Sequence, residues 1–207
     1  MAIYLIRHGE TDLNRARVVQ VPETPLSSLG RDQARRLGRR LVGEPIERLI
    51  ASDLARADET ARAISLAIRV DVESEPLLQE RNFGAIRGTA YADLAESPFA
   101  PGYAPPEGET WAAFHARVDA AWARIRDLAA PLSGHLAVVT HGLVLHSLMV
   151  RHLALPADVA RAPDDGPPLS FGNTALSIAD GRAPYRVSLL GCTAHLEGEA
   201  SQGVSGL

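Results

Sequence analysis

The sequence predicts an α/β fold with a mostly parallel central sheet. Short apolar runs typical of buried strands alternate along the chain with longer segments that carry an apolar stripe at helical spacing. The chain has 207 residues, no internal repeat and no linker long enough to divide it. We therefore expect a single domain over residues 1–196, followed by a flexible tail over residues 197–207.

The first half of the chain is expected to supply three strands and two helices. Apolar runs predict strands at residues 2–6, 46–51 and 70–73, and the stretch between the first of these and Pro25 is expected to be a loop. Leu29, Ala34, Leu37 and Leu41 give a helical stripe that predicts a helix closed by Gly43. A second helix is expected over roughly residues 55–69.

The second half begins with an irregular segment and then resumes the alternation. Residues 84–109 are rich in Gly, Pro and small residues, which predicts loops with one short helix near residues 91–96. A strong amphipathic pattern opens at Thr110 and ends at Pro131, which predicts a long helix. The remaining expected elements are a strand at 136–140, a helix at about 143–153, a loop at 156–168 and two late strands at 173–179 and 185–190.

Composition restricts the possible function classes. The net charge of −4 argues against general binding to nucleic acid or to anionic membranes, because both need a cationic face. All 21 basic residues are arginine, so no Schiff-base or P-loop lysine is available. The one cysteine, Cys192, cannot form an intramolecular disulfide, and no apolar run is long enough for a signal peptide or a membrane span. A cytoplasmic protein is expected.

Polar clusters follow the predicted strands where parallel strands would end together. Arg7-His8-Gly9 follows the first strand and Thr140-His141-Gly142 follows the strand at 136–140. Ser52-Asp53 follows another and leads to Arg56 at the start of a helix. Ligands of parallel sheets bind beyond the carboxyl ends of the strands, so these clusters mark the candidate site.

Two imidazoles and two guanidiniums at one edge would suit a phosphoryl group. Guanidiniums match phosphate oxygens geometrically and stay charged at neutral pH. One imidazole could attack phosphorus while the other, protonated, hydrogen-bonds the equatorial oxygens. A carboxyl group such as Glu80 could protonate the leaving oxygen. The arginines and the second imidazole would neutralise the charge, so no metal is required.

Several ordered motifs resemble the histidine phosphatase superfamily, which includes the cofactor-dependent phosphoglycerate mutases. Any one of these motifs would be a weak signal, whereas five in the family's order are specific. The five motifs are Leu5-Ile6-Arg7-His8-Gly9-Glu10-Thr11 with Asn14, Thr24-Pro25-Leu26-Ser27, Ser52-Asp53-Leu54-Ala55-Arg56-Ala57, Glu80-Arg81-Asn82-Phe83-Gly84 and Thr140-His141-Gly142. The ending Thr193-Ala194-His195-Leu196 also resembles that of the phosphatase members.

The resemblance implies a three-layer α/β/α sandwich and a set of site residues. His8 is implied as the phosphorylated nucleophile, Glu80 as the proton donor and His141 as the group that stabilises the transition state. The implied substrate-binding residues are Arg7, Asn14, Gln20, Arg56, Arg81 and Leu143. Leu143 departs from the second glycine of many members, and its side chain is expected to narrow the pocket while leaving its backbone N–H available. No cofactor is implied, and a homodimer is the assembly suggested.

The reaction that follows the phosphohistidine separates the alternatives. Residues 88–116 contain no arginine or lysine, and Phe83 stands where mutases usually have a tyrosine, so the resemblance favours a phosphatase acting on a small phosphorylated metabolite. A phosphoglycerate mutase is the alternative, and a non-catalytic phosphate-ester binding module is a third hypothesis. A metal-dependent hydrolase is disfavoured because His141, His146 and His152 would lie on different helix faces.

Overall fold

The computed structural model describes residues 1–156, 159 and 169–197, so most of the predicted tail and of the loop at 156–168 lies outside the described residues. The strands are β1 (Ala2–Arg7), β2 (Ile46–Ala51), β3 (Val72–Ser74), β4 (His135–Thr140), β5 (Leu176–Asp180) and β6 (Val187–Cys192). The α-helices are α1 (Asp12–Ala16), α2 (Ser28–Arg40), α3 (Ala55–Ile68), α4 (Trp111–Ala129) and α5 (Gly142–His152). Short 3₁₀ turns span Pro76–Leu78, Gly84–Ile86, Tyr91–Asp93 and Ala194–Leu196.

The six strands form one mixed sheet in the order β3-β2-β4-β1-β5-β6. β1, β2, β3 and β4 pair in parallel, whereas β5 pairs antiparallel with both β1 and β6. The central strands β1 and β4 are almost fully buried, as expected for strands covered on both faces. The fold is the mostly parallel α/β arrangement that the sequence predicts.

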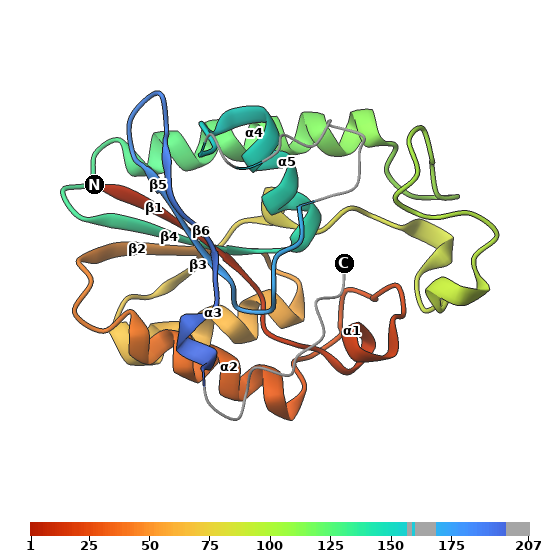
Figure 1. Cartoon of the computed structure of the whole chain (residues 1–207), viewed down its shortest axis with the longest axis horizontal. Helices are drawn as coiled ribbons and strands as arrows, with labels where there is room; N and C mark the ends of the chain where they lie inside the picture. The colour runs from red at the N-terminus through yellow and green to blue at the C-terminus, as the bar shows by residue number, and fades with distance from the viewer. Residues whose placement is uncertain (157–158, 160–168, 198–207) are drawn as a thin grey trace.

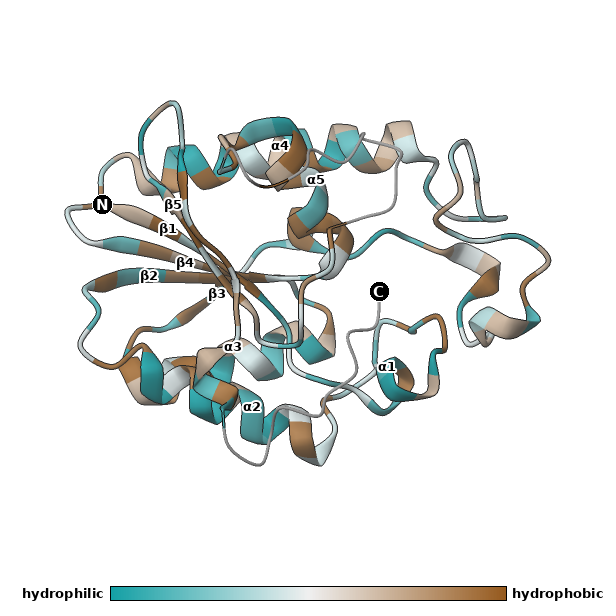
Figure 2. Ribbon diagram, viewed as in Figure 1, coloured by the Kyte–Doolittle hydropathy of each residue, from teal (hydrophilic) through white to brown (hydrophobic). Residues whose placement is uncertain are grey.

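Helices cover both faces of the sheet and create the three layers (Figure 1). α2 and α3 pack on one face, where β1 contributes Tyr4 and Ile6 to the core. α4 and α5 pack on the other face, where β1 contributes Ile3 and Leu5. This alternation follows from the two-residue period of a strand, and Figure 2 shows apolar residues concentrated along the central strands.

The segment after β1 contains a helix that was expected to be a loop. Thr11 accepts a hydrogen bond from the backbone N–H of Asn14, and the Asn14 side chain accepts one from the backbone N–H of Thr11. This reciprocal capping box starts the five-residue helix α1, which ends at Arg17 with φ 54°. Figure 1 places α1 and the irregular segment 84–109 together beyond the carboxyl ends of the central strands.

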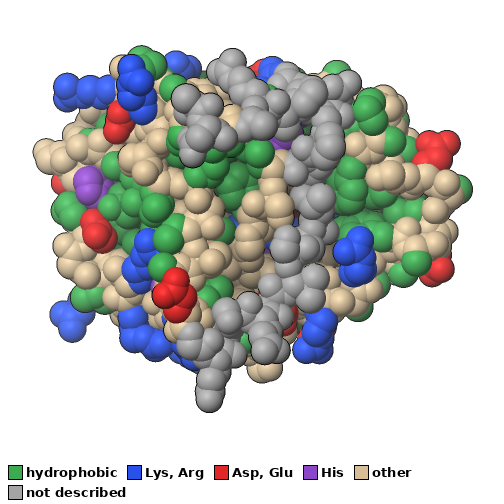
Figure 3. Space-filling view, viewed as in Figure 1, with side chains coloured by type: hydrophobic (Ala, Val, Ile, Leu, Met, Phe, Trp, Pro, Cys, Tyr) green, Lys and Arg blue, Asp and Glu red, His purple; other side chains and the backbone are tan. Residues whose placement is uncertain are grey.

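Charged side chains of both signs are dispersed over the face shown in Figure 3. On α2, Asp32 forms ion pairs with Arg35 and Arg36. Such exposed pairs contribute little stability, typically less than about 1 kcal/mol. None of the helices in the described part of the chain has the length and apolar character needed to cross a membrane.

The strand register brings the polar clusters together. Arg7 of β1 is paired with Thr140 of β4, and Ala51 of β2 is paired with Val139 of the same strand. The residues that follow, His8, His141 and Ser52, therefore leave the sheet at one edge. The backbone N–H of His8 donates to the carbonyl of Thr140 over 2.9 Å, which extends the pairing by one residue into the site.

A close approach between α2 and the loop after His8 gives a test of this packing. A Cβ atom at Gly30 would lie 2.0 Å from the carbonyl oxygen of Glu10, so Gly30→Ala must displace the loop or the helix. Overpacking of this kind costs about 1–3 kcal/mol. We expect the unfolding midpoint to fall by roughly 3–10 °C in a thermal melt. Arg35→Ala, at an exposed position of the same helix, is the matched control, and equal midpoints for both variants would contradict the packing described.

Candidate active site

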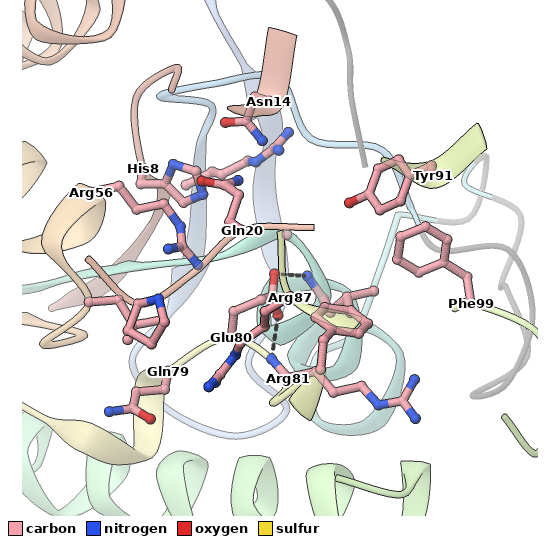
Figure 4. A pocket seen from close by; sticks show the side chains of 16 residues that line it. His8, Asn14, Gln20, Arg56, Gln79, Glu80, Arg81, Arg87, Tyr91 and Phe99 are labelled. Atoms are coloured by element: carbon pink, nitrogen blue, oxygen red, sulfur yellow. Dashed lines mark hydrogen bonds between the residues drawn. The ribbon is translucent and has the colours of Figure 1, made fainter. Parts of the chain in front are cut away.

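A pocket lies beyond the carboxyl ends of β1, β2 and β4 (Figure 4). Its walls come from the residues after these strands, from the α1 region and from the segment 84–109. The lining residues are Arg7, His8, Asn14, Gln20, Pro22, Leu54, Arg56, Gln79, Glu80, Arg81, Phe83, Arg87, Tyr91, Phe99, Gly142 and Leu143. Of the nine residues proposed from the sequence, only His141 is absent from this lining, and its ring centroid lies 5.1 Å from that of His8.

His8 is held in one orientation by its own loop. Its Nδ1 lies 2.7 Å from the carbonyl oxygen of Gly9, and a carbonyl can only accept, so Nδ1 carries the proton. In the neutral ring, Nε2 therefore has the free lone pair. Burial, then the charges of Arg56 and Arg7, hold the pKa of His8 well below its usual value. The ring is thus neutral and suited to act as a nucleophile.

His141 is the second buried imidazole. Its Nε2 lies 2.9 Å from the Ser52 hydroxyl, and its Nδ1 is buried without a hydrogen-bond partner. Burial and the neighbouring charge of Arg56 keep its pKa well below the usual value in this structure. A protonated ring is expected from the sequence, but without an anion beside it the ring is neutral.

Two buried guanidiniums, Arg7 and Arg56, flank the imidazoles. Arg7 donates to the carbonyl of Phe171, and Arg56 donates to the carbonyl of Val21 over 3.3 Å. The Nε of Arg56 is buried and has no hydrogen-bond partner. Burial lowers the pKa of Arg56 to about 10, so it remains charged at neutral pH. Such a pair of desolvated cations favours binding of an anion.

Among the described residues, Glu80 is the one carboxylate that lines the pocket. It accepts hydrogen bonds from the backbone N–H of Arg81 over 3.0 Å and from that of Leu143 over 3.2 Å. Burial raises its pKa, against the opposing effect of these bonds and of Arg56 and Arg7. The N–H of Leu143, expected to be available for substrate, is therefore engaged with Glu80.

The α1 region supplies two amides to the pocket. The Thr11 hydroxyl donates to the Gln20 side-chain oxygen over 2.9 Å, and the Asn14 oxygen accepts from Thr11. Because both oxygens are occupied by these bonds, the amide nitrogens of Asn14 and Gln20 are the groups left to face an anion. Thr11 orients both amides, a role that the sequence analysis did not assign.

Arg81 is directed mainly toward the protein itself. Its guanidinium donates to the backbone carbonyls of Pro98, Tyr103 and Glu109 over 2.6–3.1 Å. It also lies over the Trp111 ring, 3.9 Å from the ring centroid. These contacts fix the segment 84–109 and differ from the substrate contact expected for Arg81.

The segment 84–109 contributes one cation that the sequence analysis overlooked. The stretch without arginine or lysine that favoured a phosphatase begins at residue 88, and Arg87, just before it, lines the pocket. Tyr91 and Phe99 from the same segment line the pocket and pack edge to face with centroids 5.7 Å apart. The segment 84–109, the covering segment of the pocket, therefore supplies one cation to it.

Within the described residues, no group of three or more His, Cys, Asp or Glu side chains is placed to hold a metal ion. Arg7 and Arg56 are the charged groups positioned to balance negative charge, and the second imidazole is a further hydrogen-bonding group beside them. The site can thus bind a dianion and present a neutral imidazole to it.

Comparison with known proteins assigns the class. A family model for the histidine phosphatase superfamily (branch 1) matches residues 3–182. The chain belongs to this superfamily, whose members are phosphatases or mutases.

Individual relatives point to both activities. The chain is 33% identical over 171 residues to a probable phosphoglycerate mutase GpmB of Proteus mirabilis, covering 78% of this chain and 79% of the relative. Bacillus stearothermophilus YhfR matches with a TM-score of 0.78 and 26% identity over 95% of this chain and 99% of that one. A putative alpha-ribazole-5'-P phosphatase from Escherichia coli matches with a TM-score of 0.75 and 27% identity, covering 94% and 97%.

The contacts of Arg81 predict a structural effect of its replacement. Arg81→Gln removes charged hydrogen bonds to three backbone carbonyls, each worth about 1.5–3 kcal/mol, and a contact with Trp111. We expect a fall of at least about 2 kcal/mol in the free energy of unfolding and faster proteolysis within residues 84–109. Urea unfolding and limited proteolysis measure these effects. Arg124→Gln, at a half-exposed arginine on α4, is the control, and unchanged proteolysis of Arg81→Gln would contradict the assigned role.

Proposed function

We propose that this protein is a metal-independent phosphomonoester hydrolase that acts through a phosphohistidine at His8 on a small phosphorylated metabolite. The observation that carries the proposal is the hydrogen bond from His8 Nδ1 to the Gly9 carbonyl. It leaves Nε2 as the nucleophilic atom, in a pocket lined by Arg7 and Arg56.

In the first half-reaction, the arginines bind the phosphoryl oxygens and His8 Nε2 attacks phosphorus. The N–P bond forms as the bond from phosphorus to the leaving oxygen breaks. His141 Nε2 accepts a hydrogen bond from the Ser52 hydroxyl, so the proton of the neutral ring is on Nδ1, where it can be donated to an equatorial oxygen. A dianion beside His141 also raises its pKa and strengthens this donation as charge develops.

Glu80 supplies the proton for the leaving oxygen. Its raised pKa keeps a fraction of the carboxyl groups protonated at mildly acidic pH. The backbone donors from Arg81 and Leu143 fix the orientation of the carboxyl group. The products of this step are the free alcohol, the phosphohistidine and the Glu80 carboxylate.

The second half-reaction returns the enzyme to its starting state. Water attacks phosphorus, the N–P bond breaks, and the Glu80 carboxylate takes a proton from the water. Inorganic phosphate leaves, with His8 neutral and Glu80 protonated again. Glu80 thus acts as acid in one step and as base in the next, as microscopic reversibility requires.

A phosphoglycerate mutase is the second candidate, because the probable GpmB relatives are similar over most of the chain. In a mutase, the phosphohistidine transfers its phosphoryl group to a hydroxyl group of a phosphorylated hydroxy acid instead of to water. Phe83 and the short covering segment favour water as the acceptor, whereas Arg87 gives the pocket a cation that a carboxylate could use. The acceptor is decided by measuring phosphate release against isomerisation of 3-phosphoglycerate with its bisphosphate primer.

Turnover without a metal, and its dependence on His8, tests the proposal. The protein releases phosphate from p-nitrophenyl phosphate in the presence of EDTA, and His8→Ala lowers the rate by at least about a thousandfold because the nucleophile is lost. His152→Gln, at a residue paired with Asp119 at the end of α5, keeps the rate and serves as control. A rate that EDTA abolishes, or that survives in His8→Ala, contradicts the proposal. Absence of turnover with every ester would favour the binding-module hypothesis.

The role of Glu80 as the acid is tested by removing its proton. Glu80→Gln slows alkyl phosphates by about 10²–10⁴-fold, but slows p-nitrophenyl phosphate much less because its leaving group needs no proton. For the parent enzyme, kcat/KM with an alkyl phosphate falls as pH rises through the raised pKa of Glu80, since the protonated form is the active one. This fall of kcat/KM with rising pH is absent in Glu80→Gln.

Because the parent enzyme and Glu80→Gln are assayed with the same alkyl phosphate, the ionisation of the substrate affects both pH profiles equally and cancels in the comparison. Glu73→Gln, which removes an exposed carboxylate paired with Arg48, is the control for a change of net charge. Equal slowing of alkyl and aryl esters by Glu80→Gln would remove Glu80 from the role of acid.

A further inference from the structure

Arg87 lines the pocket but belongs neither to the phosphate-binding pair nor to the contacts that hold the covering segment. We propose that Arg87 binds a second anionic group, a carboxylate or a phosphate, on the leaving part of the substrate. The preferred substrates would then be phosphomonoesters of acidic alcohols. This inference rests on the proposed function and adds the substrate class to it.

The backbone around Arg87 is fixed on both sides. Its N–H donates to the carbonyl of Gly84 over 3.3 Å at the end of a 3₁₀ turn. The next residue, Gly88, has φ 83° and donates to the carbonyl of Val19 over 2.7 Å. Thr89 accepts from the N–H of Val19 over 2.9 Å, so this short stretch pairs with the chain that leads to Gln20. Arg87 is therefore presented to the pocket by a defined turn.

The Arg87 side chain makes no hydrogen bond or ion pair with any residue that the structure describes. It is half-buried, whereas Arg7 and Arg56 are almost fully buried. This difference places Arg87 nearer to solvent than the phosphate-binding pair, on the side where a leaving group would extend. Burial lowers the pKa of Arg56, and the charges of Arg7 and, to a smaller extent, Arg87 act in the same direction.

A comparison of the charges in the pocket indicates that Arg87 lacks an anionic partner. The two charges of a phosphomonoester dianion match Arg7 and Arg56. Arg81 is satisfied by the carbonyls of the covering segment, and Glu80 is neutral when it acts as the acid. Arg87 is the remaining cation among the lining residues that the structure describes. A substrate with a second anion would balance it, and a neutral alcohol would leave it unpaired in a partly desolvated site.

The rest of the outer pocket fits the carbon skeleton of such a substrate. Figure 4 shows Tyr91 and Phe99 together on the side of the pocket away from Arg56 and Gln79. Their rings offer an apolar surface, while Arg87 offers the charge. The outer pocket therefore offers an apolar surface for the carbon skeleton and a cation for a second anionic group.

Matched substrate pairs test the proposal. The carboxylate pair is 3-phosphoglycerate and glycerol 3-phosphate, and the phosphate pair is propane-1,3-diol bisphosphate and its monophosphate. We expect the parent enzyme to prefer the more anionic member of at least one pair by about tenfold or more in kcat/KM. Arg87→Gln removes most of that preference, mainly through KM, and Arg87→Lys restores part of it. The pair that shows the preference identifies the second anion as carboxylate or phosphate.

Arg62→Gln removes an equal charge at an exposed ion pair on α3 and leaves the preference unchanged. If the enzyme hydrolyses both members of each pair but Arg87→Gln keeps the same ratios, the role of Arg87 is overturned while the phosphatase proposal stands. The role of Arg87 is also overturned if the parent enzyme has equal kcat/KM for the two members of each pair. If no ester is hydrolysed by the parent enzyme, the proposed function itself fails, and the substrate class fails with it.

Discussion

The parallel pairing of β1 with β4 is the constraint on which the site depends. Both strands are buried at the centre of the sheet, and the register of Arg7 with Thr140 makes the next residue of each strand a neighbour of the other. His8 and His141 follow these two residues, so their rings lie 5.1 Å apart without any contribution from flexible loops. A shift of the register by one residue would turn the strand side chains to opposite faces and separate the two imidazoles.

Burial of charge gives this edge of the sheet its chemical character. Arg7, Arg56, His8 and His141 are each at most 4% exposed. Desolvation together with the cations keeps both imidazoles neutral, and the same desolvation raises the pKa of Glu80. A neutral nucleophile, fixed cations and a protonatable carboxyl group are what metal-independent phosphoryl transfer requires. The proposed reactivity therefore comes from where the fold places ordinary side chains.

Much of this arrangement could be predicted from local sequence. The apolar runs before Arg7 and Thr140 indicate buried strands, and ordered polar clusters after them indicate a site at their ends. The five-residue helix α1 was missed because it has no apolar stripe, although the Thr11-x-x-Asn14 spacing of its capping box was visible. Its boundaries depend on two side-chain hydrogen bonds and not on burial.

Other features depend on contacts between distant segments and have no local signal. The sequence does not show that Glu80 accepts a hydrogen bond from the N–H of Leu143, 63 positions away, or that His141 is hydrogen-bonded to Ser52, 89 positions away. The contacts of Arg81 and the position of Arg87 have no local signal either. Arg81 lines the pocket but donates its hydrogen bonds to carbonyls of the segment 84–109, whereas Arg87, for which no role was predicted, lines the pocket beside the turn at Gly88.

The most direct test of the account is the location of the transferred phosphoryl group. The enzyme would be mixed with a ³²P-labelled phosphomonoester, quenched with base within its first turnovers, digested and sequenced by mass spectrometry. The account predicts a base-stable, acid-labile phosphoryl group on His8 that forms before steady-state release of phosphate. Steady-state hydrolysis with no phosphoryl group on His8, or with the group on His141 instead, would contradict it.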